Sequence, residues 1–77
     1  MRYVILHNIR SKYNVGAIFR TADAARVSKI FLTGYTPSPL DRFGRVDTEI
    51  MKTSLGAADT VSFEYVATIE TGLERLK

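Results

Sequence analysis

The residues best suited to chemistry lie in one short stretch, Asn14-Val15-Gly16-Ala17-Ile18-Phe19-Arg20-Thr21-Ala22. An apolar run that predicts a strand precedes it, and ligands of open α/β sheets bind at the edge where such strands end. A helix starting here would offer unpaired N–H groups and the positive end of its dipole, both suited to phosphate. Gly16 and Arg20 share one stripe of that helix, so the arginine would lean back over a turn with no side chain to block a ligand. The spacing predicts a seat for a nucleic-acid phosphate or ribose.

Each of these residues also has a purely structural explanation. Asn14 is a good helix N-cap, and Gly16 would allow close packing of the helix on a strand. Arg20 could pair with Asp23 on a solvated helix face. Spacing alone does not decide between the two interpretations, because motifs this short often occur by chance.

Alternating strands and helices must position this stretch. The order β-α-β-α-β-α predicts a Rossmann-like, mostly parallel α/β sheet with right-handed crossovers. Pro37 and Pro39 forbid regular structure between the second strand and the second helix, which predicts a loop there. The expected elements are a strand over 3–6, a helix from Asn14 to about Arg26, a strand over 29–33, a loop over 34–45, a short helix capped by Asp47 and closed near Gly56, a strand over 61–65 and a helix capped by Thr68.

Positive charge is concentrated in the first part of the chain, which favours a polyanionic partner, RNA first. Up to residue 45 only Asp23 and Asp41 oppose the basic residues, and the balance reverses afterwards. A solvated surface with a chance asymmetry is the alternative. The basic residues in question are Arg2, Arg10, Lys12, Arg20, Arg26, Lys29, Arg42 and Arg45.

Two groups of these cations are further candidates for RNA binding. Arg10 and Lys12 flank the end of the first strand, where they could contact backbone phosphates. Arg42, Phe43 and Arg45 lie on the long loop, where an aromatic ring between cations could stack on a base. Ordinary surface residues are the alternative for all five.

Composition excludes several other classes of site and of protein. The chain of 77 residues has no cysteine and one histidine, so neither a disulfide nor a histidine–cysteine metal site is expected. No apolar run approaches the roughly 20 residues that span a bilayer, and the N-terminus lacks the layout of a signal peptide. We expect a cytoplasmic protein with no membrane partner, and a single small, incomplete domain over residues 1–77.

Taken in order, the motifs resemble those of the SpoU (TrmH-type) RNA 2′-O-ribose methyltransferases of the SPOUT superfamily. The resemblance covers nearly the whole chain. It is carried by Asn14-x-Gly16-x-x-x-Arg20-Thr21-Ala22, by Lys29-Ile30-Phe31-Leu32-Thr33-Gly34-Tyr35-Thr36-Pro37 and by Lys52-Thr53-Ser54-Leu55-Gly56-Ala57.

The resemblance implies the N-terminal half of an α/β-knot domain without the knot region. It also implies methyl transfer from S-adenosylmethionine to a ribose 2′-hydroxyl of tRNA or rRNA, by an enzyme that is usually a dimer. Arg20 matches the catalytic arginine of the family, and Asn14 matches the asparagine that helps to position the site. The two later motifs that form the cofactor pocket are not found, so no cofactor-binding residue is expected in this chain.

Two other functions remain open on sequence grounds. One is a non-catalytic RNA-binding α/β module that uses the same basic surface. The other is a small phosphate-binding α/β domain with no role in RNA. Binding of RNA that weakens steeply with salt would favour the first over the second.

Overall fold

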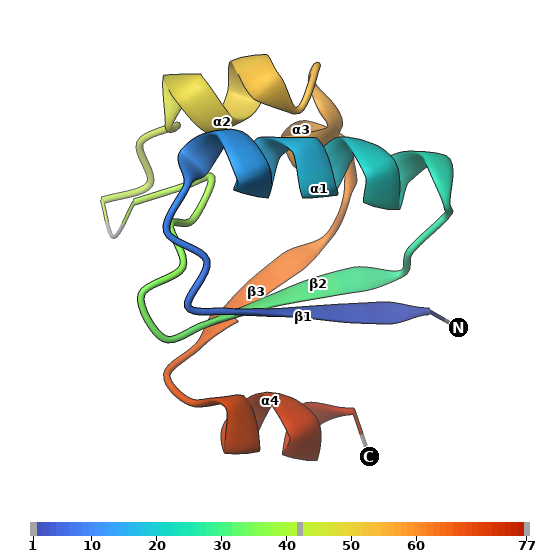
Figure 1. Cartoon of the computed structure of the whole chain (residues 1–77), viewed down its shortest axis with the longest axis vertical. Helices are drawn as coiled ribbons and strands as arrows, with labels where there is room; N and C mark the ends of the chain where they lie inside the picture. Colours follow the sequence, from blue (N-terminus) through green and yellow to red (C-terminus); the bar gives the residue numbers. More distant parts are fainter. Residues whose placement is uncertain (1, 42, 77) are drawn as a thin grey trace.

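Three parallel strands form the centre of the molecule, as the sequence predicts (Figure 1). The computed structural model describes residues 2–41 and 43–76. Strands β1 (Tyr3–His7), β2 (Lys29–Thr33) and β3 (Phe63–Val66) lie in the order β1-β2-β3. In register, Val4 is opposite Ile30, and Ile30 is opposite Phe63. All three strands therefore end at the same edge of the sheet.

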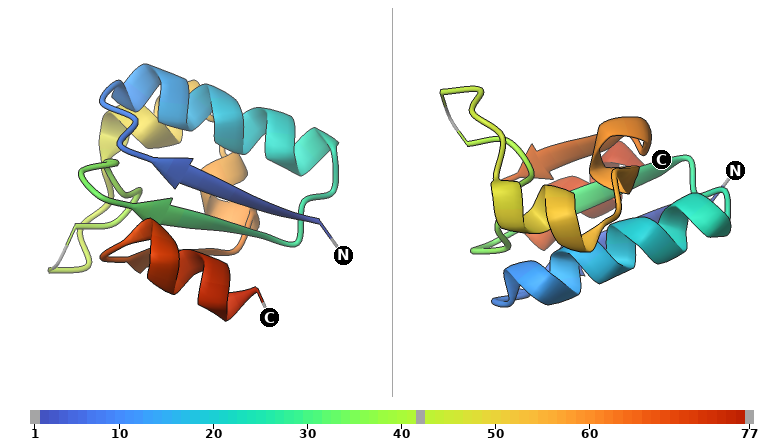
Figure 2. Two further views of the ribbon diagram at one scale, coloured as in Figure 1. Left: turned by 60° about the horizontal axis from the view of Figure 1, so that its bottom comes forward. Right: turned by 90° about the horizontal axis from the view of Figure 1, so that it is seen from above.

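Helices cover both faces of this sheet. Helices α1 (Lys12–Ala24), α2 (Thr48–Thr53) and α3 (Ala57–Thr60) lie on one face, and α4 (Ile69–Arg75) lies on the other (Figure 1). Seen from above, α1 and α2 lie side by side (Figure 2). The single helix expected after residue 47 is in fact two, because Leu55 and Gly56 adopt left-handed backbone angles between α2 and α3.

The first helix begins earlier than the sequence suggests. Ser11, not Asn14, is its N-cap, and the Ser11 hydroxyl accepts a hydrogen bond from the Asn14 backbone amide at 3.1 Å. Asn14 therefore lies within the first turn of α1, with its side chain exposed. The helix ends at Ala24, just before Arg26, whose φ is 58°.

Apolar side chains from α1, α2 and the strands meet in one core on the three-helix face. Phe19, Ile30 and Ile50 are fully buried, and each contributes about 1.5–3 kcal/mol of hydrophobic stabilisation. The rings of Phe19 and Phe63 pack edge to face, 5.7 Å apart. This core fixes α1 over the sheet and so sets where its exposed residues lie.

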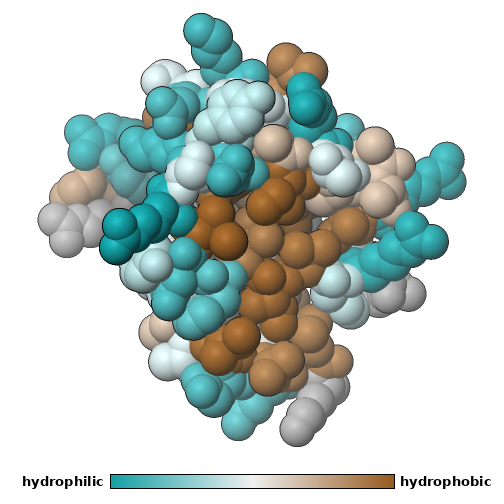
Figure 3. All heavy atoms as spheres, viewed as in Figure 1, coloured by the Kyte–Doolittle hydropathy of each residue, from teal (hydrophilic) through white to brown (hydrophobic). Residues whose placement is uncertain are grey.

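A band of hydrophobic side chains crosses the molecule where β1 forms the edge of the sheet, between α1 and α4 (Figure 3). An edge strand flanked by apolar side chains is a surface on which further chain can pack. Residues that line a hollow in this band are Val4, Ile18, Thr21, Ala22, Ala25 and Val27.

Candidate functional site

The carboxyl edge of the sheet is held together by hydrogen bonds between the segments that follow β1 and β2. The Thr33 and Thr36 hydroxyls both donate to the Leu6 carbonyl oxygen, at 3.3 and 3.0 Å. The Ile9 amide in turn donates to the Thr36 hydroxyl. His7 Nδ1 lies 2.8 Å from the Thr33 hydroxyl, which gives this histidine a structural role.

Asn8 fixes the turn after β2. Its side-chain oxygen accepts a hydrogen bond from the Tyr35 backbone amide at 3.1 Å. A side chain at Gly34 would overlap that of Asn8, and Gly34 has a φ of 65°, so only glycine fits there. The Tyr65 hydroxyl closes the turn by donating to the Gly34 carbonyl oxygen at 2.6 Å. The backbone of Tyr35 is thus held from both sides.

Arg10, in the segment after β1, packs its side chain against this fixed turn. Its guanidinium carbon is 5.6 Å from the centre of the Tyr35 ring, within the range of a cation–π contact. Tyr35 remains 57% exposed. The sequence analysis identified Arg10 as a candidate but missed Tyr35, although an exposed aromatic directly after a strand-ending glycine was a usable signal.

Lys12 is already engaged within the protein. Its ammonium lies 2.8 Å from the Asp47 carboxylate, whose other oxygen caps α2 by accepting from the Glu49 and Ile50 amides. The hydrogen bond that the Lys12 ammonium donates to the Asp47 carboxylate raises the pKa of Lys12. Burial works to raise the pKa of Asp47, but the hydrogen bonds from Lys12 and the two amides outweigh it and lower that pKa. Phosphate would compete with Asp47 for Lys12, and the role of Lys12 in RNA binding stays a prediction.

Removing the Asp47 cap should destabilise α2. We expect Asp47→Ala to lower the free energy of unfolding by about 1 kcal/mol at pH 7, whereas Asp47→Asn keeps a capping oxygen and loses about 0.5 kcal/mol or less. Urea titrations followed by circular dichroism would measure both. Equal losses in the two variants would show that the ion pair, not the cap, is what matters.

The same residue makes stability depend on acid pH. The pKa of Asp47 is lower in the folded chain than in the unfolded chain, where an aspartate titrates near pH 4. The ionised carboxylate therefore stabilises the fold fully above about pH 4, and this stabilisation is lost as the pH falls through the pKa of the folded state. The difference between the wild type and Asp47→Asn should shrink across that window. A difference that grows as the pH falls would contradict this assignment.

Gly16 is not an open entrance for a ligand. It is buried, and a Cβ added there would overlap the Thr53 side chain and lie 3.1 Å from the Ile50 carbonyl oxygen. Its missing side chain lets α2 pack closely on α1. The prediction of an open helix entrance for RNA is therefore wrong. The packing alternative holds, except that Gly16 packs against helix α2 rather than against a strand.

Arg20 lies in the third turn of α1 and is exposed. Its Cα lies about 12 Å along the helix axis from the start of α1. It lies about 9 Å beyond Asn14 and points about 120° away from it, so the two side chains leave the helix on different sides. Among the described residues no carboxylate pairs with Arg20, and Asp23 instead lies 3.5 Å from the Thr60 hydroxyl.

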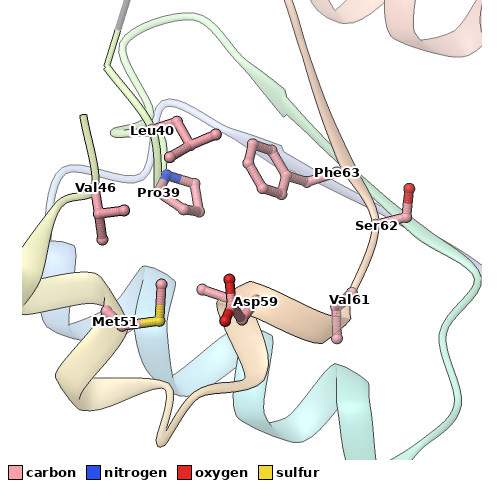
Figure 4. Close-up of a pocket in the computed structure, with 9 residues that line it drawn as sticks. Pro39, Leu40, Val46, Met51, Asp59, Val61, Ser62 and Phe63 are labelled. Carbon is pink, nitrogen blue, oxygen red and sulfur yellow. The ribbon is translucent and has the colours of Figure 1, made fainter. Parts of the chain in front are cut away.

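The long loop is anchored at its base and exposed at its tip. Leu40 and Val46 form an isolated antiparallel bridge. Together with Pro39 they line a hollow of about 230 Å³, whose wall also includes Met51 and Phe63 (Figure 4). The loop is therefore packed against the rest of the protein rather than forming a free arm.

At the loop tip, Arg45 is bound to Asp41, with Nε 2.9 Å from the carboxylate. Hydrogen bonds from the Arg45 and Phe43 backbone amides and from the Arg45 side chain outweigh burial and lower the pKa of Asp41. The Arg45 guanidinium also lies 5.2 Å from the centre of the Phe43 ring. The third candidate of this group, Arg42, lies outside the described residues.

Other kinds of site find little support in the described part of the chain. Residues 2–41 and 43–76 contain no group of acidic or histidine side chains that could hold a metal ion. None of the described helices has the length and apolar character needed to cross a bilayer.

Comparison with known proteins gives the family. The SpoU rRNA Methylase family matches residues 1–77. The 23S rRNA (guanosine-2′-O-)-methyltransferase RlmB of Bordetella pertussis is 32% identical over 74 residues, which cover 96% of this chain and 28% of that protein. The same enzyme of Blochmanniella floridana is 34% identical over 74 residues, covering 27% of its length. This chain thus spans less than a third of these relatives.

The fold is similar to solved methyltransferase structures. The AdoMet-bound rRNA methyltransferase of Sinorhizobium meliloti superimposes with a TM-score of 0.78 and 32% identity, over 95% of this chain and 25% of that one. A second crystal structure of an rRNA methyltransferase from this organism gives a TM-score of 0.75. The sequence and structural matches cover the same parallel α/β unit, and the chain belongs to the SpoU rRNA methylase family.

Proposed function

We propose that this chain is part of an RNA methyltransferase that transfers a methyl group from S-adenosylmethionine to a ribose 2′-hydroxyl. The observation that carries the proposal is the family match over all 77 residues. Relatives named as 23S rRNA guanosine-2′-O-methyltransferases favour rRNA over tRNA as the substrate. Modification of rRNA in turn supports a cytoplasmic location. The chain spans less than a third of those relatives, so we propose the activity for the complete enzyme.

We propose Arg20 as the cation that acts on the ribose. Its guanidinium is exposed, and among the described residues it is not neutralised by a carboxylate. A guanidinium does not lose its proton in proteins and is therefore a poor base at neutral pH. Arg20 would therefore hold the sugar-phosphate and stabilise the negative charge that develops on the attacking oxygen.

Asn14 has a different part in the proposal. It lies in the first turn of α1, near the carboxyl edge, on a different side of the helix from Arg20. We propose that it positions the RNA rather than contacting the same atoms as Arg20. The hydrophobic band along β1 supports the further proposal that the complete enzyme is a dimer.

We propose that the described residues do not form the binding site for S-adenosylmethionine. A hollow of about 510 Å³ at the carboxyl edge is lined by both polar and apolar side chains, and its two carboxylates, Asp41 and Asp47, are engaged by Arg45 and Lys12. When bound in the complete enzyme, the cofactor supplies the methyl group. We place its pocket outside the described residues of this chain.

Calorimetry tests the placement of the cofactor. Titration of the 77-residue chain with S-adenosylmethionine should give no saturable heat, because in this proposal the groups that hold the adenosyl and methionyl ends lie outside the described residues. The Sinorhizobium meliloti methyltransferase serves as the positive control. Micromolar binding by the chain would contradict the placement.

A chimera tests the function. Residues 1–77 would replace the matching 74-residue segment of the Bordetella pertussis relative, and transfer of labelled methyl groups to 23S rRNA would be measured. We expect methylation at the position that the parent enzyme modifies. A chimera that binds the cofactor and RNA but transfers no methyl group would instead favour a non-catalytic RNA-binding module.

A further inference from the structure

We propose that Tyr35 and Arg10 together form a stacking platform for one unpaired base of the RNA. The inference rests on the proposed function, because it takes RNA as the ligand. It adds the residue that would hold an unstacked base at the carboxyl edge of the sheet.

The first support is that the platform is exposed yet fixed. More than half of the Tyr35 side chain is in contact with solvent, while its backbone amide is bound by Asn8 and the preceding Gly34 is bound by Tyr65. A side chain held at its base loses little freedom when a base stacks on it, so little affinity is lost to ordering.

The second support is the charge of the platform. The Arg10 guanidinium lies over the Tyr35 ring, and among the described residues no carboxylate pairs with it. A planar cation beside an aromatic ring suits a nucleobase together with its phosphate. The base would occupy the part of the ring that Arg10 leaves open.

The third support is that the geometry favours single-stranded RNA. Bases within an A-form duplex are stacked on each other and cannot reach a tyrosine ring, whereas bases in loops and bulges can. The second aromatic–cation pair, Phe43 with Arg45, is less suited, because Asp41 already neutralises its arginine. It therefore provides a matched control.

The test measures RNA binding by the 77-residue chain. The probe is an RNA hairpin with 2-aminopurine in its unpaired loop, compared with a fully paired duplex of the same length. We expect Tyr35→Ala to weaken binding of the hairpin about tenfold and to abolish quenching of the 2-aminopurine, with no change for the duplex. Tyr35→Phe should retain both affinity and quenching, and Phe43→Ala should change hairpin binding less than twofold.

Salt dependence separates the two members of the platform. Arg10→Gln should reduce the slope of log affinity against log salt by about 0.7, whereas Tyr35→Ala should leave the slope unchanged. Hairpin binding by Tyr35→Ala that equals the wild type, or a wild-type chain that binds no RNA, would overturn the inference. Neither result affects the methyl-transfer assay of the chimera, and that assay tests the proposed function separately.

Discussion

Replacing Arg20 with lysine should lower the kcat of methyl transfer by the chimera about a hundredfold. Lysine keeps the positive charge but lacks the planar fork that can hold a phosphate and the developing alkoxide at once. Arg20 is exposed on α1 and makes no ion pair among the described residues, so the change should leave the free energy of unfolding nearly unaltered. Single-turnover kinetics with 23S rRNA would separate the chemical step from RNA binding.

Arg26→Lys is the matched control for this substitution. Arg26 is also exposed and lies just beyond the end of the same helix, so its replacement should change kcat less than twofold. If Arg20→Lys turned over at a near-normal rate, the proposed charge stabilisation would be wrong. A loss seen only in RNA affinity would make Arg20 a binding residue.

The order of strands and helices was predictable because each element carries its own pattern. The apolar run at β1 and the alternation of apolar and polar residues at β3 are local signals. The parallel topology follows because strands and helices alternate along the chain. The start of α1 was misplaced by three residues because Ser11 and Asn14 are both good N-caps. In the structure the Ser11 hydroxyl accepts the hydrogen bond from the Asn14 amide, which makes Ser11 the cap.

The site was less predictable because its contacts join residues far apart in the chain. Lys12 and Asp47 are each unremarkable in sequence, yet their ion pair removes Lys12 from the free cations. Tyr35 became a candidate only when Arg10 was found over its ring. The prediction of a bare helix entrance at Gly16 was wrong, because the Thr53 side chain packs there. The proposal for Arg20 now rests on the family match and on its unpaired charge.

Gly16→Ala should destabilise the chain even though alanine is the better helix former. Alanine contributes about 1 kcal/mol of helix propensity, but its methyl group would overlap the Thr53 side chain and press α2 away from α1. We expect a net loss of about 2 kcal/mol in the free energy of unfolding, measured by urea titration, which is a large share of the stability of a small domain. Ala17→Val, on the neighbouring position of α1, should cost less than about 1 kcal/mol.

A double-mutant cycle shows whether the cost arises at this contact. Thr53→Gly removes both side-chain atoms that a methyl group at position 16 would meet, so Gly16→Ala should cost much less in that background. The remaining neighbour, the Ile50 carbonyl oxygen, need shift only slightly. If glycine were required to admit RNA, Gly16→Ala would instead leave unfolding unchanged and weaken RNA binding. That result would support the open helix entrance after all, because the free energy of unfolding depends on packing at Gly16, whereas RNA affinity depends on whether RNA can reach it.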